Sequence, residues 1–222
     1  MLVTGSRHSA VDRAKWLWSA EQNLNLDPEV WLNHLVAGRY GLVVLAGLYY
    51  GILHFLVTPV VLIWLRTHRP GGYAALRNAL VGSTMAALVA YWLLPLAPPR
   101  LSVSAIIDTS RVHDILFAAS PSGPAALANQ YAAMPSLHVA WAVWVALAVI
   151  FAFPGSRTRH LAWAYPLSTT LVVMATGNHF LADAVAGALF TWAAWAIASG
   201  LDTSEVRLVR PVRTARPALE HL

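Results

Sequence analysis

Long apolar runs are the feature that most constrains how this chain can fold. Five runs reach the roughly 17 to 25 residues that a helix needs to cross a bilayer core about 30 Å thick. They lie near residues 41–65, 78–95, 135–153, 160–177 and 180–200. Because 58% of the 222 residues are hydrophobic and only 11% are charged, an ordinary soluble domain is excluded. We expect an all-α fold, a polytopic membrane helix bundle.

The segment before the first run has a different pattern. In residues 12–34, tryptophans and leucines are interspersed with acidic and basic residues, which is typical of an amphipathic helix at the membrane interface. The first run has an apolar lead-in from Trp31 that contains Arg39 and several glycines. This lead-in leaves room for a broken first span or a half-inserted helix, so the sequence predicts five to six transmembrane helices.

Arginine residues predict the orientation. They gather between the first and second runs, between the third and fourth runs, and in the tail: Arg66, Arg69, Arg77, Arg157, Arg159, Arg207, Arg210, Arg213 and Arg216. With five spans these segments share one side, which the positive-inside rule makes cytoplasmic together with the C-terminus. The net charge of +5 forms no continuous basic stripe, so a nucleic-acid partner is not expected. The expected location is a bacterial cell membrane.

Two short polar signatures open apolar runs on the opposite, extracytoplasmic face. The first runs from Met134 to His138 and the second from Gly177 to Asp183. Ionisable side chains inside a span are costly and mark a functional site. His179 and Asp183 stand at i and i+4 on one helix face, where the carboxylate can accept the imidazole N–H and leave the other ring nitrogen free to attack. His138 would supply the acid and base for the same reaction.

At these residues the chain resembles the type 2 phosphatidic acid phosphatase (PAP2) superfamily, and within it the branch of inositolphosphotransferases and inositol phosphorylceramide synthases. The Pro-Ser-x-His signature of that family is present as Pro135 to His138, and its His-x-x-x-Asp signature as His179 and Asp183. The resemblance covers roughly residues 35–200 and also takes in Pro98-Pro99-Arg100, residues 129–133 and Gly187. The resemblance implies a PAP2-like transmembrane catalytic domain (35–200). With the amphipathic pattern and the arginine count, the sequence predicts an N-terminal interfacial segment (1–34) before it and a basic cytoplasmic tail (201–222) after it.

The chain also departs from the pattern of the superfamily. Phosphatases of this group usually carry a lysine and an arginine in the first signature and a Ser-Arg pair before the final histidine. Here the only lysine is Lys15, and the positions before His179 hold Val172 and Val173. The inositolphosphotransferase-like branch resembles this chain in lacking the second arginine. Arg100 remains to neutralise a phosphate, with Arg39 as a second candidate at the same face.

A mechanism follows from the chemistry of these side chains. Arg100 and the start of the helix after Ser136 would hold the phosphoryl group, with Asn178 in the neighbouring turn as a further donor. His179 would attack phosphorus, Asp183 would stabilise the imidazolium, and His138 would protonate the departing oxygen. The expected partner is a phosphorylated lipid in the bilayer, and the scheme requires no metal and no cofactor.

Alternatives remain open from sequence alone. The acceptor of the phosphoryl group is water in a lipid phosphatase and an alcohol in an inositolphosphate transferase. An alternative function outside the enzymes is a proton-coupled transporter in which the histidines and the aspartate form a proton relay. Two histidines and a carboxylate can also bind zinc. His54 is expected to be a packing or hydrogen-bonding residue, and the polar residues of the connection 101–133 (Asp108, Arg111, His113 and Asp114) a solvated loop that could cap the headgroup.

Overall fold

The computed structural model describes residues 7–109 and 130–208. The elements in this part of the chain are helices: α1 Arg7–Asn23, α2 Glu29–Ala37, α3 Tyr40–Leu48, the π-helical turn η1 Tyr49–Leu53, α4 His54–His68, α5 Pro70–Leu93, α6 Pro99–Ser102, α9 Leu137–Ala152, the 3-10 helix η3 Arg157–Trp163, α10 Ala164–Ala175 and α11 Leu181–Leu208. An isolated bridge between Leu96 and Ala132 is the only strand-like pairing among the described residues. The prediction of an all-α helix bundle is confirmed.

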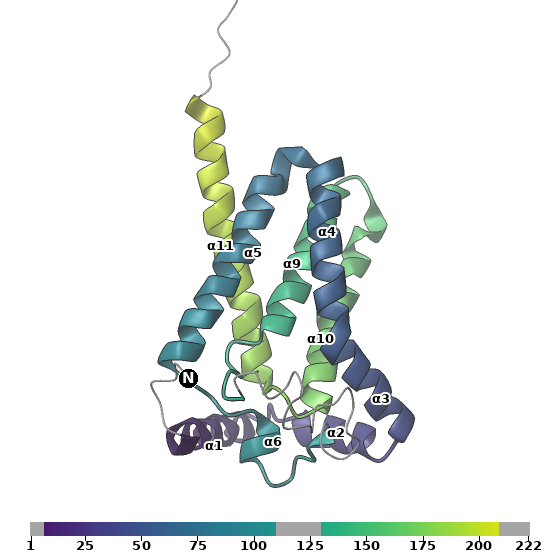
Figure 1. The fold of residues 1–222 in the computed structure, drawn as a ribbon, viewed down its shortest axis with the longest axis vertical. Helices are drawn as coiled ribbons and strands as arrows, with labels where there is room; N and C mark the ends of the chain where they lie inside the picture. Colours follow the sequence, from purple (N-terminus) through teal and green to yellow (C-terminus); the bar gives the residue numbers. More distant parts are fainter. Residues whose placement is uncertain (1–6, 110–129, 209–222) are drawn as a thin grey trace, which may run out of the picture.

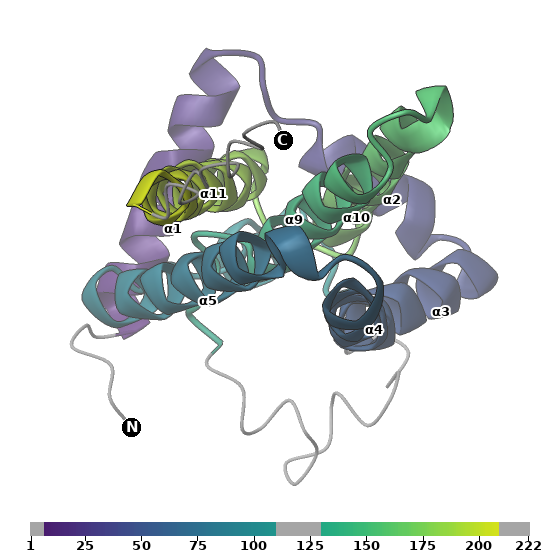
Figure 2. The same cartoon turned by 90° about the horizontal axis from the view of Figure 1, so that it is seen from above.

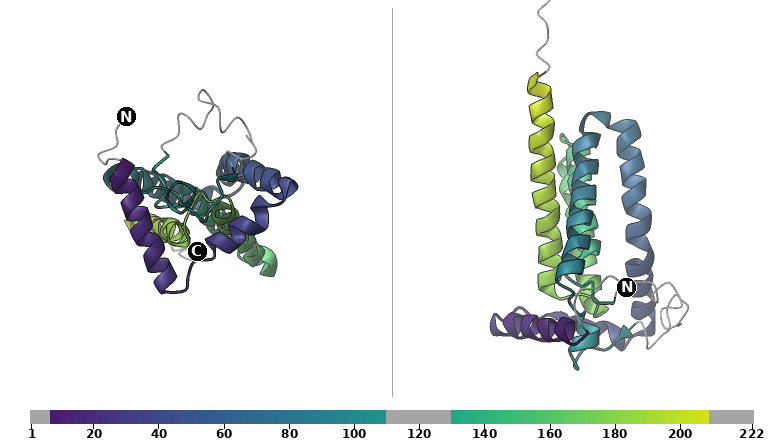
Figure 3. Two further views of the ribbon diagram at one scale, coloured as in Figure 1. Left: turned by 90° about the horizontal axis from the view of Figure 1, so that it is seen from below. Right: turned by 60° about the vertical axis from the view of Figure 1, so that its left-hand side comes forward.

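The helices form an upright bundle closed at one end. Helices α4, α5, α9, α10 and α11 stand side by side, and α1, α2 and α6 lie across their lower end (Figure 1). The view from below and the side view show α1 running across the foot of the upright helices (Figure 3). The N-terminal and C-terminal ends of different upright helices therefore meet against this transverse layer.

Helix α9 is the centre of the bundle. It contacts α4, α5, α10 and α11, and it lies among them when the bundle is viewed from above (Figure 2). Alanines alternate with larger apolar residues along this helix, which lets its neighbours approach closely. The largest buried side chain, Trp144, is fully covered, and its indole N–H donates to the Leu76 carbonyl at 2.7 Å. The buried indole nitrogen of Trp144 thus has a hydrogen-bond acceptor within the protein.

Length and hydropathy together separate the clear membrane spans from the other described helices. Tyr40–His68, which joins α3, η1 and α4, and Leu181–Gly200 within α11 are long and apolar enough to cross a bilayer. Helix α9 is apolar but has 16 residues, and α10 has 12, so at 1.5 Å per residue they extend about 24 Å and 18 Å. Both fall short of a hydrocarbon core of about 30 Å. The number of five to six spans therefore stays a prediction.

The lead-in to the first span is a helix of its own. Residues 40–68 form one continuous helical rod with a π turn at Tyr49–Leu53, and the chain before it forms α2. The region 12–34, predicted as one amphipathic helix, is divided between α1 and α2. The break has a local cause, because Asn25 adopts a left-handed φ of 55° and Pro28 precedes α2.

The last helix extends past residue 200, where the expected tail begins. Helix α11 continues to Leu208, so the first residues of the expected tail extend the last helix. Residues 209–222 of the tail, and residues 110–129 of the connection with Arg111, His113 and Asp114, lie outside the described residues.

At Gly187, the backbone of α11 lies close against the start of α9. A Cβ atom built on Gly187 would collide with the carbonyl oxygen of Ser136 and would lie 3.3 Å from the Ala140 nitrogen. Gly82 on α5 offers a contrast, because its added Cβ would meet only the Ala194 methyl at an ordinary 3.7 Å. The bare backbone of Gly187 therefore sets the position of the first turns of α11 on α9.

We predict that Gly187→Ala lowers the free energy of unfolding by about 1 to 3 kcal/mol, because overpacking outweighs the better helix propensity of alanine. Thermal unfolding in detergent measures the change. The control Gly82→Ala, at which the methyl group has room, should leave the midpoint unchanged or raise it. Equal midpoints for the two variants would show that the approach at Gly187 is not tight.

Candidate functional site

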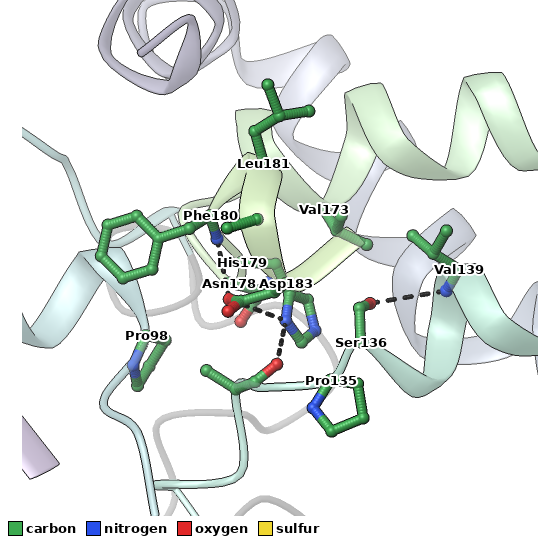
Figure 4. A network of polar contacts seen from close by, with 12 residues as sticks. Pro98, Pro135, Ser136, Val139, Val173, Asn178, His179, Phe180, Leu181 and Asp183 are labelled. Atoms are coloured by element: carbon green, nitrogen blue, oxygen red, sulfur yellow. Dashed lines mark hydrogen bonds and ion pairs between the residues drawn. The ribbon is translucent and has the colours of Figure 1, made fainter. Parts of the chain in front are cut away.

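The two polar signatures meet at the closed end of the bundle. Ser136 lies at the start of α9, and Asn178 and His179 lie in the turn between α10 and α11 (Figure 4). His138 belongs to the first turn of α9. A backbone hydrogen bond of 2.9 Å from Ser136 N–H to the Asp183 carbonyl joins them directly. Segments far apart in sequence therefore form one site.

The turn after α10 aims His179 inward. Gly177 has a φ of +70°, a conformation that glycine adopts without strain, and a Cβ there would lie 2.7 Å from a methyl carbon of Ile106. The backbone N–H groups of Asn178 and His179 both donate to the Val173 carbonyl, at 3.0 and 3.2 Å. These bonds close the end of α10 and reverse the chain into α11.

His179 is held through one ring nitrogen. Its Nδ1 lies 2.8 Å from the Ala133 carbonyl oxygen and 3.5 Å from Oδ2 of Asp183. Both neighbours are acceptors, so the ring hydrogen is assigned to Nδ1 and Nε2 keeps its lone pair. The spacing correctly predicted the pair with Asp183, but the nearer acceptor, Ala133, was missed because nothing in an alanine marks its carbonyl as a partner.

Asp183 has two roles at the start of α11. Its Oδ2 also accepts the Phe180 N–H at 2.9 Å, so the carboxylate caps its own helix while it faces His179. The side chain is fully buried, and His179 is 4% exposed. The start of α11 therefore sets the orientation of the Asp183 carboxylate and holds it beside the His179 imidazole.

His138 faces His179 across the site. The two ring centroids are 5.9 Å apart. On its other side the His138 ring stacks on Tyr50 at 4.0 Å and contacts His54 at 4.0 Å. His54 is thus a packing residue, as predicted, but the group it packs on is a candidate catalytic histidine. It follows the π turn η1, and such turns are frequent at functional sites.

Ser136 caps α9. Its Oγ accepts the Val139 N–H at 3.4 Å, and the residue is fully buried. This N-cap role follows from its place before Leu137 and leaves the hydroxyl hydrogen available to an acceptor.

Arg100 reaches the same turn from α6. Its backbone N–H donates to the Gly177 carbonyl at 3.0 Å, and its guanidinium donates to the side-chain oxygen of Asn178. Asp108 lies 3.8 Å from its Nε, so this carboxylate belongs to the surroundings of Arg100 rather than to a solvated loop. Asn178 in turn donates to Thr176 Oγ1 at 2.8 Å. The predicted pair of Arg100 and Asn178 is brought together.

Arg39 lies elsewhere. It precedes α3, its side chain is exposed, and its guanidinium donates to the Leu35 carbonyl one turn back. Among the described contacts, none joins Arg39 to the other predicted site residues. It shares their end of the bundle, as the topology predicted, but it points away along α2.

Two buried glutamates at the site were not anticipated. Glu29 accepts the Leu181 N–H at 2.6 Å and Glu21 accepts the Ala182 N–H at 2.7 Å, two and three residues after His179. Acidic residues of an amphipathic segment are normally solvated, so the pattern alone gave no signal for them. Within the described residues, no group of three or more His, Asp and Glu side chains is arranged to hold a metal ion.

A family model, rather than an individual known protein, matches this chain. No curated protein and no solved structure matches the chain. A family model described as the PAP2 superfamily matches residues 15–197, from within α1 to within α11, and so includes both signatures. With most of its length matched and with the two histidines and the aspartate of the signatures gathered in one site, the chain belongs to the PAP2 superfamily.

Proposed function

We propose that this protein is an integral membrane lipid phosphatase or phosphotransferase that acts through a phosphohistidine. Members of the PAP2 superfamily are generally phosphatases or phosphotransferases. The observation that carries the proposal is the pairing of a histidine whose Nδ1 is tied to Ala133 and Asp183 with a second histidine ring 5.9 Å away. One ring is set up to attack and the other to move a proton.

The phosphate would lie between Arg100 and the start of α9. The Arg100 guanidinium is a permanent planar cation suited to phosphate oxygens, and Asn178 holds it at the turn that carries His179. The N-terminus of α9, capped by Ser136, adds backbone dipoles that favour an anion. Phosphoryl transfer depends mainly on such positioning and charge neutralisation.

The first step would form the phosphoenzyme. Nε2 of His179 attacks phosphorus as the bond from phosphorus to the lipid oxygen breaks. Protonated His138 gives its proton to the departing oxygen, and Asp183 stabilises the positive charge on His179. In the second step neutral His138 takes a proton from the incoming hydroxyl, whose oxygen attacks phosphorus and releases His179.

The incoming hydroxyl belongs to water or to an alcohol. Val173, which stands in the region where other phosphatases of the group carry a cation, is 1% exposed and packs with Val139 and Val143. Arg100 is the arginine with described contacts at the turn. This sparse set of cations is the feature shared with the inositolphosphotransferase-like branch, and it supports transfer of an inositol phosphate to a lipid alcohol as the alternative reaction.

The arrangement gives less support to a proton-coupled transporter. Relay groups should be distributed through the depth of the membrane, whereas His138, His179 and Asp183 all lie at one end of the bundle.

The site lies at the opposite end of the bundle from the arginines between α4 and α5. Arg66 lies over the Tyr73 ring and Arg69 over the Phe153 ring, at 5.7 and 5.8 Å, at the end of the bundle opposite His179. With the basic end in the cytoplasm, the catalytic end would open to the outer leaflet of the cell membrane.

We predict that wild-type protein turns over one member of a panel of phosphorylated lipids, and that His179→Ala abolishes this turnover. Asp183→Asn should lower kcat by about two to four orders of magnitude, because an amide cannot stabilise the imidazolium. Release of inorganic phosphate and formation of new phospholipid, with and without inositol-containing acceptors, are measured separately. His160→Ala, an exposed histidine in η3, is the matched control and should behave as wild type. Wild-type activity in His179→Ala would refute the mechanism.

We also predict the sidedness of the site. The chain has no cysteine, so single cysteines can be labelled without background. An impermeant thiol reagent on intact cells should label Ser104→Cys, which is exposed after α6, and should spare Thr158→Cys, which is exposed in η3. Labelling of Thr158→Cys alone would place the histidines in the cytoplasm.

A further inference from the structure

The first turn of α11 is capped by three carboxylates from three helices. The N–H groups of Phe180, Leu181 and Ala182 would have no partner within the helix, because the first four amides of any α-helix lack one. Phe180 donates to Asp183 of the same helix at 2.9 Å. The other two N–H groups donate to carboxylates of the transverse layer. Leu181 donates to Glu29 of α2, and Ala182 donates to Glu21 of α1.

The N-terminal helices are tied to the site by more than these two bonds. Asn33 of α2 donates to the carbonyls of Ile107 and Ala175, both at 3.0 Å, and accepts the Ile107 N–H at 2.8 Å. Asn33 and Glu29 are both fully buried, and Glu21 is 6% exposed. The contacts of α2 thus bracket the turn that carries His179, from the end of α10 to the start of α11.

We propose that Glu21 and Glu29 are positioning residues that, by capping α11, hold the His179 and Asp183 pair at its working geometry. The proposal rests on the proposed phosphoryl transfer at His179. His179 stands two residues before Leu181, and Asp183 lies in the same turn as Ala182, so a shift of this turn moves both groups relative to Ala133. Misplacement of reacting groups by about 1 Å can cost 100-fold in rate.

Charge gives the pair of glutamates a pH dependence. The pKa of Glu21 is raised from 4.5 to about 8, chiefly by burial and also by the nearby carboxylates of Glu29, Asp183 and Asp27, although the hydrogen bond from the Ala182 N–H lowers it. Burial likewise raises the pKa of Glu29. The raised pKa means that Glu21 binds its proton more tightly when α1 is docked on α11 than when it is not. Protonation therefore favours docking, and this contribution is complete below pH 4.5. That preference is lost as the pH rises through about 8.

Amide and alanine substitutions separate the roles of Glu21. Glutamine keeps an oxygen to accept the Ala182 N–H and resembles the protonated carboxyl, whereas alanine removes the acceptor and leaves a buried amide without it. The matched control is Asp12→Asn, an exposed acid on the same helix. The full chain in detergent is assayed from pH 6 to 9.5 with the lipid that wild type turns over best, and hydrogen exchange is followed in peptides that cover residues 176–190.

We expect Glu21→Ala and Glu29→Ala to lower kcat about 10- to 100-fold with KM changed less than about threefold, and to lose exchange protection at Leu181 and Ala182. Glu21→Gln should keep kcat within about threefold of wild type at pH 7. It should also keep its activity as the pH rises from 6 through about 8, the range in which wild-type activity falls. Asp12→Asn should match wild type in each measurement.

Unchanged kcat and unchanged protection in both alanine variants would overturn the proposal, and so would an alkaline loss in Glu21→Gln equal to that of wild type. If the alanine variants do not fold, hydrogen exchange of the wild-type protein tests the proposal. Its protection at Leu181 and Ala182, corrected for the intrinsic exchange rate, must fall as the pH rises from 6 to about 8. Failure of the proposed function is distinct, since it appears as wild type inactive on every lipid while the exchange results still test the cap.

Discussion

The hydrogen bond between His179 and the Ala133 carbonyl is the interaction on which the site depends. It ties the turn after α10 to the segment just before α9, at a distance of 2.8 Å between Nδ1 and the oxygen. With Nδ1 committed to that carbonyl and to Asp183, Nε2 is the only ring nitrogen left to react. The Ser136 N–H, which donates to the Asp183 carbonyl, ties the same two segments a second time.

The rest of the fold keeps these segments in place. Gly187 lets α11 press its backbone against the Ser136 cap, and Gly177 lets the chain turn sharply beneath Ile106. The transverse layer of α1 and α2 closes the end of the bundle and supplies Glu21 and Glu29 to the first turn of α11. A reactive group in a buried site is thus held by helix ends rather than by a single flexible loop.

Local periodicity accounts for what the sequence could predict. The helical spacing of His179 and Asp183 and the helix start after Ser136 depend on neighbours within a few residues, and both are found in the structure. Among the described residues, two helices are long and apolar enough to cross a bilayer. Arg100, which its motif marked as a phosphate-binding residue, contacts Gly177 and Asn178 at the turn that carries His179, and its role stays a prediction.

Contacts between distant segments could not be predicted in this way. The Ala133 carbonyl has no residue-type signal, and Glu29 reads as a solvated acid until α2 docks against α11. Topology placed Arg39 at the correct end of the bundle but could not give its direction, which is set by the Leu35 carbonyl. For His54, its place in the middle of an apolar run gave no indication that it would lie against His138.

Trapping the phosphoenzyme tests the central claim most directly. Wild-type protein is mixed with a lipid carrying a radiolabelled phosphate, quenched within milliseconds in alkali, and digested so that the labelled peptide can be sequenced. The account predicts a label that is stable in alkali and lost in acid, as expected for a phosphoramidate, and located on His179. A label on His138 or on a hydroxyl side chain, or turnover without any labelled protein at times shorter than one catalytic cycle, would contradict it.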